Sequence, residues 1–170
     1  MKHDPQATPE EARAHFWKLI GGQRVAMLTT HTHGELRARP LWLQTDKDDH
    51  SGRLSFFVPS DSEVVRDVEA DPVVGVTFAD ADKDVYLSIS GSAVVVADTM
   101  RQKDLWSAAA QAWFPGGPYD PRLRLLDVQI ASAEYWDVDD GKMVQLFKMA
   151  KAALSGRPPE NLGEHEVVKT

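Results

Sequence analysis

The sequence contains no cysteine in its 170 residues. This absence excludes disulfides, thiolate zinc sites and thiol nucleophiles. Any redox chemistry of the protein must therefore depend on a bound cofactor. Histidines and carboxylates are present, but none has the spacing of a catalytic triad or of a glycosidase acid pair, so nothing points to hydrolysis.

The sequence also lacks a long hydrophobic run and an excess of basic residues. No apolar stretch approaches the roughly 20 residues that a membrane-spanning helix requires, and residues 1–5 lack the basic-then-apolar order of a secretory signal. Lys and Arg number 19 against 26 Asp and Glu, and the net charge of −7 would repel a phosphate backbone. We therefore expect a cytoplasmic protein that binds neither a membrane nor a nucleic acid.

The residues that are present predict a β-rich chain with a few helices. A capping box and helical spacing predict a first helix over 9–20. A short helix is expected after Ser60 or Ser62, either of which can cap it, and a long helix runs from residue 99 to the Pro-Gly-Gly-Pro turn at 115–118. Apolar alternation and β-branched residues predict strands at 24–30, 36–44, 54–58, 73–79, 85–91, 92–97, 123–130 and 133–137.

These elements predict an α+β fold that is mainly β with flanking helices. Since repeated βα alternation is absent, we expect one antiparallel barrel of six or seven strands with helices over its openings. The domain is expected to cover residues 1–155, in which 144–154 fit either a helix or a strand. A polar tail at 156–170 is expected to be loosely held.

The first candidate site lies on the strand at 36–44. Arg37 and Arg39 are two residues apart, so both guanidiniums point to one face of that strand, and Pro40 and Trp42 follow them. Two guanidiniums on one face suit a phosphate. A solvated strand face held by salt bridges is the alternative.

The second candidate is the end of the strand at 54–58 together with the helix start that follows it. Free amides and the helix dipole favour an anion at such a start, where the hydroxyls of Ser60 and Ser62 could bind phosphate. Plain N-capping by serine is the alternative. Glu63 in the first turn suits the helix dipole but would repel a nearby phosphate.

The third candidate consists of Trp113 and Phe114, which precede a turn too rigid to let them continue a helix. Such rings can lie on a planar ligand, and packing in a core or a subunit interface is the alternative. His31 and His33 could meet at a hairpin tip, but no third ligand lies near them in the sequence. No metal site is predicted.

Seven segments occur in order along nearly the whole chain, at 37–42, 54–58, 86–91, 105–106, 112–118, 133–137 and 145–150. Taken together they resemble the general stress protein subgroup of the pyridoxamine 5′-phosphate oxidase-like, FMN-binding split-barrel superfamily. The Trp-Phe-Pro-Gly-Gly-Pro turn followed by the Glu-Tyr-Trp strand is the most specific of these signals.

The resemblance implies a homodimer of split barrels, with FMN, or alternatively FAD, in each of two clefts at the subunit interface. Carried over by position, the cofactor-binding residues would be Arg37, Arg39, Pro40, Trp42, Phe57, Val58, Ser60, Ser62, Trp113 and Phe114. Relatives often carry a lysine two residues after Ser62, where this chain has Val64, so the arginines would carry more of the phosphate binding.

The resemblance does not extend to the substrate of the true oxidases. The C-terminus at 163–170 differs from the arginine-and-histidine ending of pyridoxamine-phosphate oxidases, so vitamin B6 oxidation is not expected. Three functions stay open: a flavin-dependent oxidoreductase acting on an unknown small molecule, a non-catalytic flavin carrier, buffer or stress sensor, and a structural dimer without cofactor. Catalytic residues are unknown. Because a barrel of this size is filled by its own side chains, we expect the flavin outside it, with Trp106, Trp113 and Phe114 between two subunits.

Overall fold

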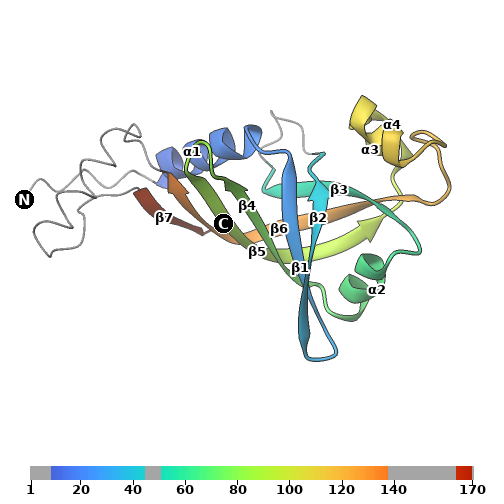
Figure 1. The fold of residues 1–170 in the computed structure, drawn as a ribbon, viewed down its shortest axis with the longest axis horizontal. Coiled ribbons are helices and arrows are strands. Elements are labelled where there is room, and N and C mark those ends of the chain that lie inside the picture. The colour runs from blue at the N-terminus through green and yellow to red at the C-terminus, as the bar shows by residue number, and fades with distance from the viewer. Residues whose placement is uncertain (1–8, 45–50, 138–163, 170) are drawn as a thin grey trace, which may run out of the picture.

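The computed structural model describes residues 9–44, 51–137 and 164–169. Six strands form one antiparallel sheet whose spatial order is β2 (Glu35–Trp42), β1 (Val25–Thr32), β4 (Val73–Asp80), β5 (Val85–Val96), β6 (Leu123–Asp137) and β3 (Arg53–Pro59). A bridge between Leu43 and Phe56 links the chain after β2 to β3, so the sheet curls into a half-barrel (Figure 1). The predicted antiparallel split barrel is confirmed.

Two helices pack their apolar sides on this sheet. Helix α1 (Pro9–Gly21) buries Ala12, Phe16 and Ile20, which recur every fourth residue on one face. Helix α2 (Glu63–Ala70) buries Val64, Val65 and Val68 and lies beside the β1–β2 hairpin (Figure 1). The first two predicted helices are therefore confirmed.

The predicted long third helix is wrong, because the chain forms two short helices in its place. Helix α3 (Thr99–Asp104) ends before Leu105, and α4 (Ala108–Trp113) begins after Ser107. The Ser107 hydroxyl accepts a hydrogen bond from the Ala110 amide and so caps a new helix. The apolar spacing predicted a continuous helix across this position.

Two pairs of predicted strands each form one continuous strand. β5 covers 85–91 and all but the last residue of 92–97, and its register against β6 shifts between Ser90 and Gly91. A side chain at Gly91 would overlap the carbonyl oxygen of Gln129, so glycine permits the close approach of the two strands there. The ladder continues past this irregularity, and β6 likewise covers both 123–130 and 133–137.

The C-terminal residues differ from the loosely held tail that the sequence predicts. Residues Glu164–Lys169 form β7, which pairs with β6 as a seventh strand. The segment at 144–154 lies outside the described residues, and the domain boundary at 155 stays a prediction.

Two adjacent phenylalanines on β3 point into two different clusters. Phe56 is fully buried in the main core between the sheet, α1 and α2. Phe57 points to the opposite face, as alternation along a strand requires, and packs in a smaller cluster with Ala110, Leu123 and Leu125. This smaller cluster attaches α3 and α4 to the sheet.

Candidate functional site

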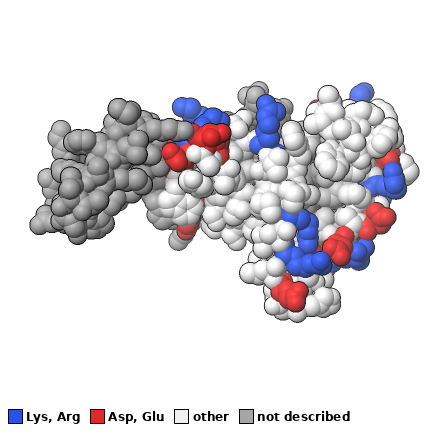
Figure 2. Space-filling view, viewed as in Figure 1, with Lys and Arg blue, Asp and Glu red and all other residues white. Residues whose placement is uncertain are grey.

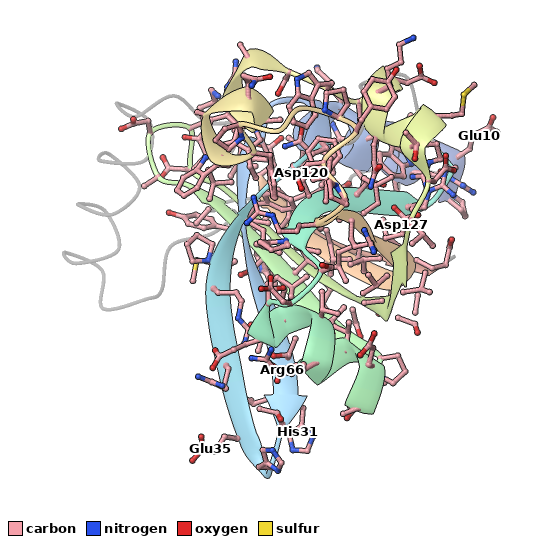
Figure 3. All side chains as sticks on the ribbon, turned by 90° about the vertical axis from the view of Figure 1, so that its right-hand side faces the viewer. Glu10, His31, Glu35, Arg66, Asp120 and Asp127 are labelled. Atoms are coloured by element: carbon pink, nitrogen blue, oxygen red, sulfur yellow. The ribbon has the colours of Figure 1, made fainter. Side chains whose placement is uncertain are left out.

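A charged pocket lies between the β1–β2 hairpin and α2. Its volume is about 450 Å³, and its lining includes His31 and His33 from the hairpin, Arg37 from β2, and Glu63 and Arg66 from α2. Figure 2 shows basic and acidic side chains mixed over this part of the surface. Figure 3 places Arg66 on α2 beside the hairpin, with His31 near the hairpin's end.

The two predicted arginines of β2 point to the same face, and each meets a carboxylate on α2. The Arg37 guanidinium lies 3.3 Å from the Glu63 carboxylate, and both side chains are about half exposed, at 45% and 59%. Arg39 lies deeper and is 2.8 Å from the Asp67 carboxylate, which is 8% exposed. Both arginines therefore make the ion pairs that the salt-bridged alternative expects, and their binding of a phosphate stays a prediction.

Asp67 is the centre of a small buried network between β1, β2 and α2. Thr30 donates a hydrogen bond of 2.8 Å to its carboxylate, and Arg39 donates to both Asp67 and the Thr30 hydroxyl. Burial raises the pKa of Asp67, but the hydrogen bonds from Thr30 and Arg39 and the charges of Arg39 and Arg37 outweigh burial, so the pKa is below its ordinary value of 3.8. Through these bonds to Asp67 and Thr30, Arg39 holds β2 against α2.

The start of α2 has a hydroxyl that makes no hydrogen bond with the residues that the structure describes. Ser62 occupies the N-cap position, but its side chain makes no capping hydrogen bond, and its buried oxygen has no hydrogen-bond partner in the described part of the chain. The alternative of plain N-capping therefore does not account for this serine. The Ser60 amide donates a hydrogen bond to the carbonyl of Arg122. This bond joins the loop before α2 to the residue just before β6.

An aromatic pocket lies at the other end of β2. Its volume is also about 450 Å³, and five predicted site residues line it: Pro40, Trp42, Phe57, Trp113 and Phe114. Six further residues complete its lining, namely Val25, Leu41, Gln44, Pro59, Ala109 and Ala110. The lining contains no titratable side chain among the described residues, so this pocket suits an apolar, planar group.

The aromatic residues of α3 and α4 have two different environments. Trp106 and Phe114 pack on Phe57 of the same chain, with ring centroids 5.6 and 6.3 Å away. Trp113 is 76% exposed and stands at the pocket's rim. Trp106 and Phe114 are partly buried on the smaller cluster of this chain, and the position of all three aromatics between subunits stays a prediction.

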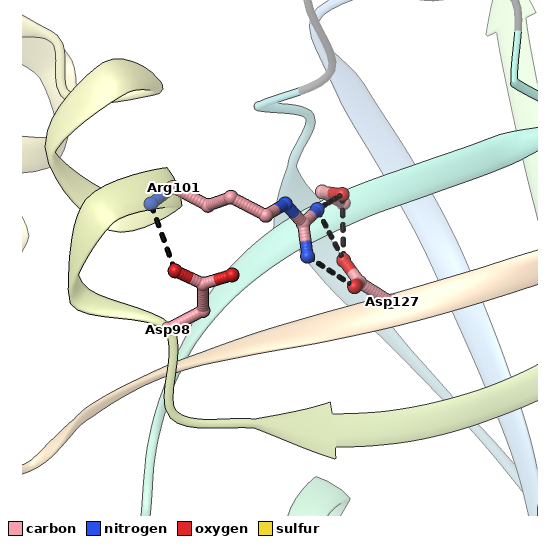
Figure 4. Close-up of polar contacts among 4 residues, drawn as sticks. Asp98, Arg101 and Asp127 are labelled. Carbon is pink, nitrogen blue, oxygen red and sulfur yellow. Dashed lines mark hydrogen bonds and ion pairs between the residues drawn. The ribbon is translucent and has the colours of Figure 1, made fainter.

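An ion pair fixes α3, and through it α4, on the sheet. Two nitrogens of Arg101 donate to the carboxylate of Asp127 on β6, at 2.6 and 3.1 Å, and Ser55 on β3 donates to the same carboxylate (Figure 4). Asp98 caps the helix by accepting from the Arg101 amide. The pair therefore fixes α3 on the sheet, and α3 precedes α4, whose Ala109, Ala110 and Trp113 line the aromatic pocket.

The ten predicted site residues separate into groups. Five line the aromatic pocket, Arg37 lines the charged pocket, and Arg39 and Ser62 stand beside the charged pocket's α2 wall. Val58 points into the main core, with 1% exposure, and neither Val58 nor Ser60 lines either pocket. Val64, where relatives often carry a lysine, is also buried in the main core.

Comparison with known proteins decides the family of this fold. A family model described as "Pyridoxamine 5′-phosphate oxidase like" matches residues 11–160. The chain belongs to the pyridoxamine 5′-phosphate oxidase-like family. The resemblance stated from the sequence is thereby confirmed.

Solved structures that are similar to this chain include several general stress proteins. A general stress protein 26 from Jannaschia sp. CCS1 is 28% identical, with a TM-score of 0.76 over 95% of this chain and 99% of that one. A general stress protein from Xanthomonas citri, described as FMN/FAD binding, is also 28% identical, with a TM-score of 0.67 over 78% of this chain and 92% of that one.

A curated relative is less similar in sequence to this chain than those two structures are. Protein bli-3 of Neurospora crassa is 24% identical over 113 residues, which cover 62% of this chain and 54% of that protein. The chain thus spans about half the length of that relative.

The described residues contain neither a cluster of metal-ligating side chains nor a membrane-spanning helix. In the described part of the chain, no group of three or more His, Cys, Asp or Glu residues is arranged to hold a metal ion. No helix among the described residues is long and apolar enough to cross a membrane.

Several residues of the two pockets and of the contacts around them were not predicted from the sequence. Val25 lines the aromatic pocket because it is the cross-strand neighbour of Trp42, a relationship that the predicted hairpin contains but that requires the exact register. Asp67 and Asp127 carried no signal, because each meets its arginine through tertiary contacts between distant segments.

Proposed function

We propose that this protein binds a flavin along β2, with the ring in the aromatic pocket and the phosphate near the charged pocket. The observation that carries the proposal is that strand β2 lines both the charged pocket and the aromatic pocket. Arg37 lines the charged pocket and Leu41 lines the aromatic pocket. Four residues of extended strand separate them by about 13 Å. Arg37 and Leu41 share one face of β2 while Pro40 and Trp42 lie on the other, so in this proposal the ribityl chain passes the edge of this strand between phosphate and ring.

The lining of the aromatic pocket suits the isoalloxazine ring in its chemistry. Trp42, Phe57, Trp113 and Phe114 offer ring faces or edges to a planar ligand, and Gln44 offers a polar group at the same pocket. FMN is the proposed cofactor, with FAD as the alternative, a proposal supported by the FMN/FAD-binding relative from Xanthomonas citri.

The start of α2 fits a phosphate group. Arg37 supplies a guanidinium, the helix start supplies amides, and the Ser62 oxygen lacks a partner in the described part of the chain. Arg39, which the sequence assigns to the cofactor, supports the site in this proposal by fixing β2 to Asp67 on α2.

A second copy of the chain completes the proposed site. The outer face of β1 and β2 leaves Val25, Met27, Leu36 and Trp42 exposed, at 47%, 41%, 76% and 38%. Together with Trp113 they form an apolar surface that a partner of the same kind would cover. The proposed homodimer therefore closes the aromatic pocket from outside.

The proposed activity is that of a flavin-dependent oxidoreductase acting on a small molecule. A bound flavin would supply hydride or electron transfer, while this chain orients the ring and excludes water from it. A non-catalytic flavin carrier, buffer or stress sensor is the second candidate, because no titratable residue of the described chain lines the aromatic pocket. A structural dimer without cofactor is the third.

The visible spectrum of the protein tests these proposals. The protein is soaked with FMN, freed of unbound ligand by gel filtration and scanned for the flavin band. A retained band supports flavin binding, and a colourless protein contradicts it and favours the structural dimer. Steady-state assays of the loaded protein with reduced nicotinamides and common acceptors then separate the other two, since turnover favours the oxidoreductase and binding without turnover the carrier.

A further inference from the structure

Glu63 competes for the guanidinium that the charged pocket offers to an anion. Its carboxylate lies 3.3 Å from Arg37. The neighbouring arginines are engaged in other contacts: Arg39 with Asp67 and Thr30, and Arg66 with the backbone carbonyl of Asp61 at 2.7 Å. An anion that enters this pocket therefore meets Arg37 already paired with a carboxylate.

Glu63 also occupies the helix start that would otherwise favour an anion. It is the first residue of α2, where a negative side chain interacts well with the helix dipole. The next residue, Val64, is buried in the core, so of these two first-turn positions it is Glu63 that reaches the pocket. A phosphate near Ser62 would thus lie close to a like charge.

We propose that Glu63 sets the ligand selectivity of the site, so that the chain binds FMN and phosphate-free riboflavin with similar affinity. This inference rests on the proposed flavin function. Because the Arg37–Glu63 pair is about half exposed, it can open at small cost, and phosphate is therefore weakened rather than excluded. The ring, held by aromatic residues far along β2, provides most of the affinity for either ligand.

The test compares the dissociation constants of FMN and riboflavin for the wild-type protein and for Glu63→Gln. In the wild type the two constants should agree within about tenfold, less than two intact charge-assisted bonds would give. Glu63→Gln should bind FMN about fivefold more tightly, by the loss of a competing charge, with riboflavin binding unchanged. Arg37→Ala should remove the remaining difference between the two ligands.

Glu69→Gln is the matched control, because Glu69 lies on the same helix, is exposed and carries the same charge. It should leave the ratio of FMN to riboflavin affinity unchanged. An equal effect of both glutamine variants would mean that net charge acts, and would overturn the proposal. A wild type that binds FMN several hundredfold more tightly than riboflavin would also overturn it.

Inorganic phosphate gives a readout that does not depend on flavin. Phosphate should raise the thermal unfolding midpoint of Glu63→Gln more than that of the wild type, at equal ionic strength set with chloride. If neither protein takes up any flavin but this difference is present, the flavin function and the FMN-to-riboflavin selectivity fail, while the competition between Glu63 and phosphate stands. If phosphate acts equally on both proteins, the role of Glu63 is wrong.

Discussion

Arg101 in α3 and Asp127 in β6 form a two-point ion pair, with nitrogen–oxygen distances of 2.6 and 3.1 Å. Asp127 is 6% exposed and also accepts a hydrogen bond from Ser55, so its carboxylate is almost fully enclosed by partners. This pair joins a helix near the aromatic pocket to the central strand of the smaller cluster.

Removing the carboxylate should loosen that junction. Asp127→Ala leaves the Arg101 charge and the Ser55 hydroxyl without their shared partner, and should lower the free energy of unfolding by about 2–3 kcal/mol. Urea denaturation measures the change. Lys103→Ala, an exposed position on the same helix, should change stability by less than about 0.5 kcal/mol. Equal losses in the two variants would contradict a specific role of the pair.

The Asp67 network should make stability depend on acid. Since the pKa of folded Asp67 lies below its ordinary value of 3.8, the ionised form stabilises the fold. That contribution is complete above the ordinary value and is lost as the pH falls through the lowered one. At neutral pH, Asp67→Asn should therefore be less stable than the wild type.

The stability difference between wild type and Asp67→Asn should shrink below about pH 4. Urea midpoints at pH 7 and pH 3 measure it, and the difference between the two proteins isolates Asp67 from the other acids. Glu69→Gln, on the exposed side of α2, should follow the wild type at both values. A difference that stays constant from neutral to acid would show that Asp67 acts by its shape and not by its charge.

The fold was predictable because its signals are local. Phe16 and Ile20 recur at helical spacing in α1, and β-branched residues mark the strands of the sheet. The break between α3 and α4 was missed because Ser107, a capping residue, lies inside an otherwise continuous apolar pattern. Strand β7 was missed because its partner β6, and not its own polar sequence, places it in the sheet.

The candidate site was predictable in its aromatic half and less so in its charged half. Trp42 and Phe57 are large rings on predicted strands, and rings of that kind gather where a pocket or an interface is built. The sequence gives the shared face of Arg37 and Arg39, but their partners lie on α2, and a contact between distant segments has no local signal.

Trp113 should contribute to flavin binding and little to folding. Its side chain is 76% exposed at the rim of the aromatic pocket, so Trp113→Ala removes few contacts of the folded chain. If the flavin ring covers Trp113, the variant should bind flavin more weakly than the wild type by about 1–2 kcal/mol. Fluorescence titration with FMN measures the affinity, and thermal unfolding without ligand measures stability.

Tyr119→Ala is the control for Trp113. Tyr119 is also an exposed aromatic, at 63%, and does not line the pocket. Its replacement should leave FMN affinity unchanged. If the two variants bind FMN equally well, Trp113 does not contact the ring.

The last prediction concerns the link between flavin binding and dimer formation. Met27 lies on the outer face of β1, 41% exposed and opposite Pro40 of the aromatic pocket. If a second copy covers this face, Met27→Glu places a charge in the interface, so the variant should be monomeric and should lose flavin. Met100→Glu makes the same change on α3, where Met100 is 76% exposed, and should retain both properties.

Analytical ultracentrifugation, with absorbance read at the flavin band, measures both properties in one experiment. For the wild type, flavin should sediment with a dimer-sized species, and dilution that separates the subunits should release it. Added FMN should shift the equilibrium toward the dimer, because a ligand stabilises the state that binds it. Flavin that sediments with a monomer-sized species would place the complete site within one chain, and Trp113 would then contact the ring without a partner subunit.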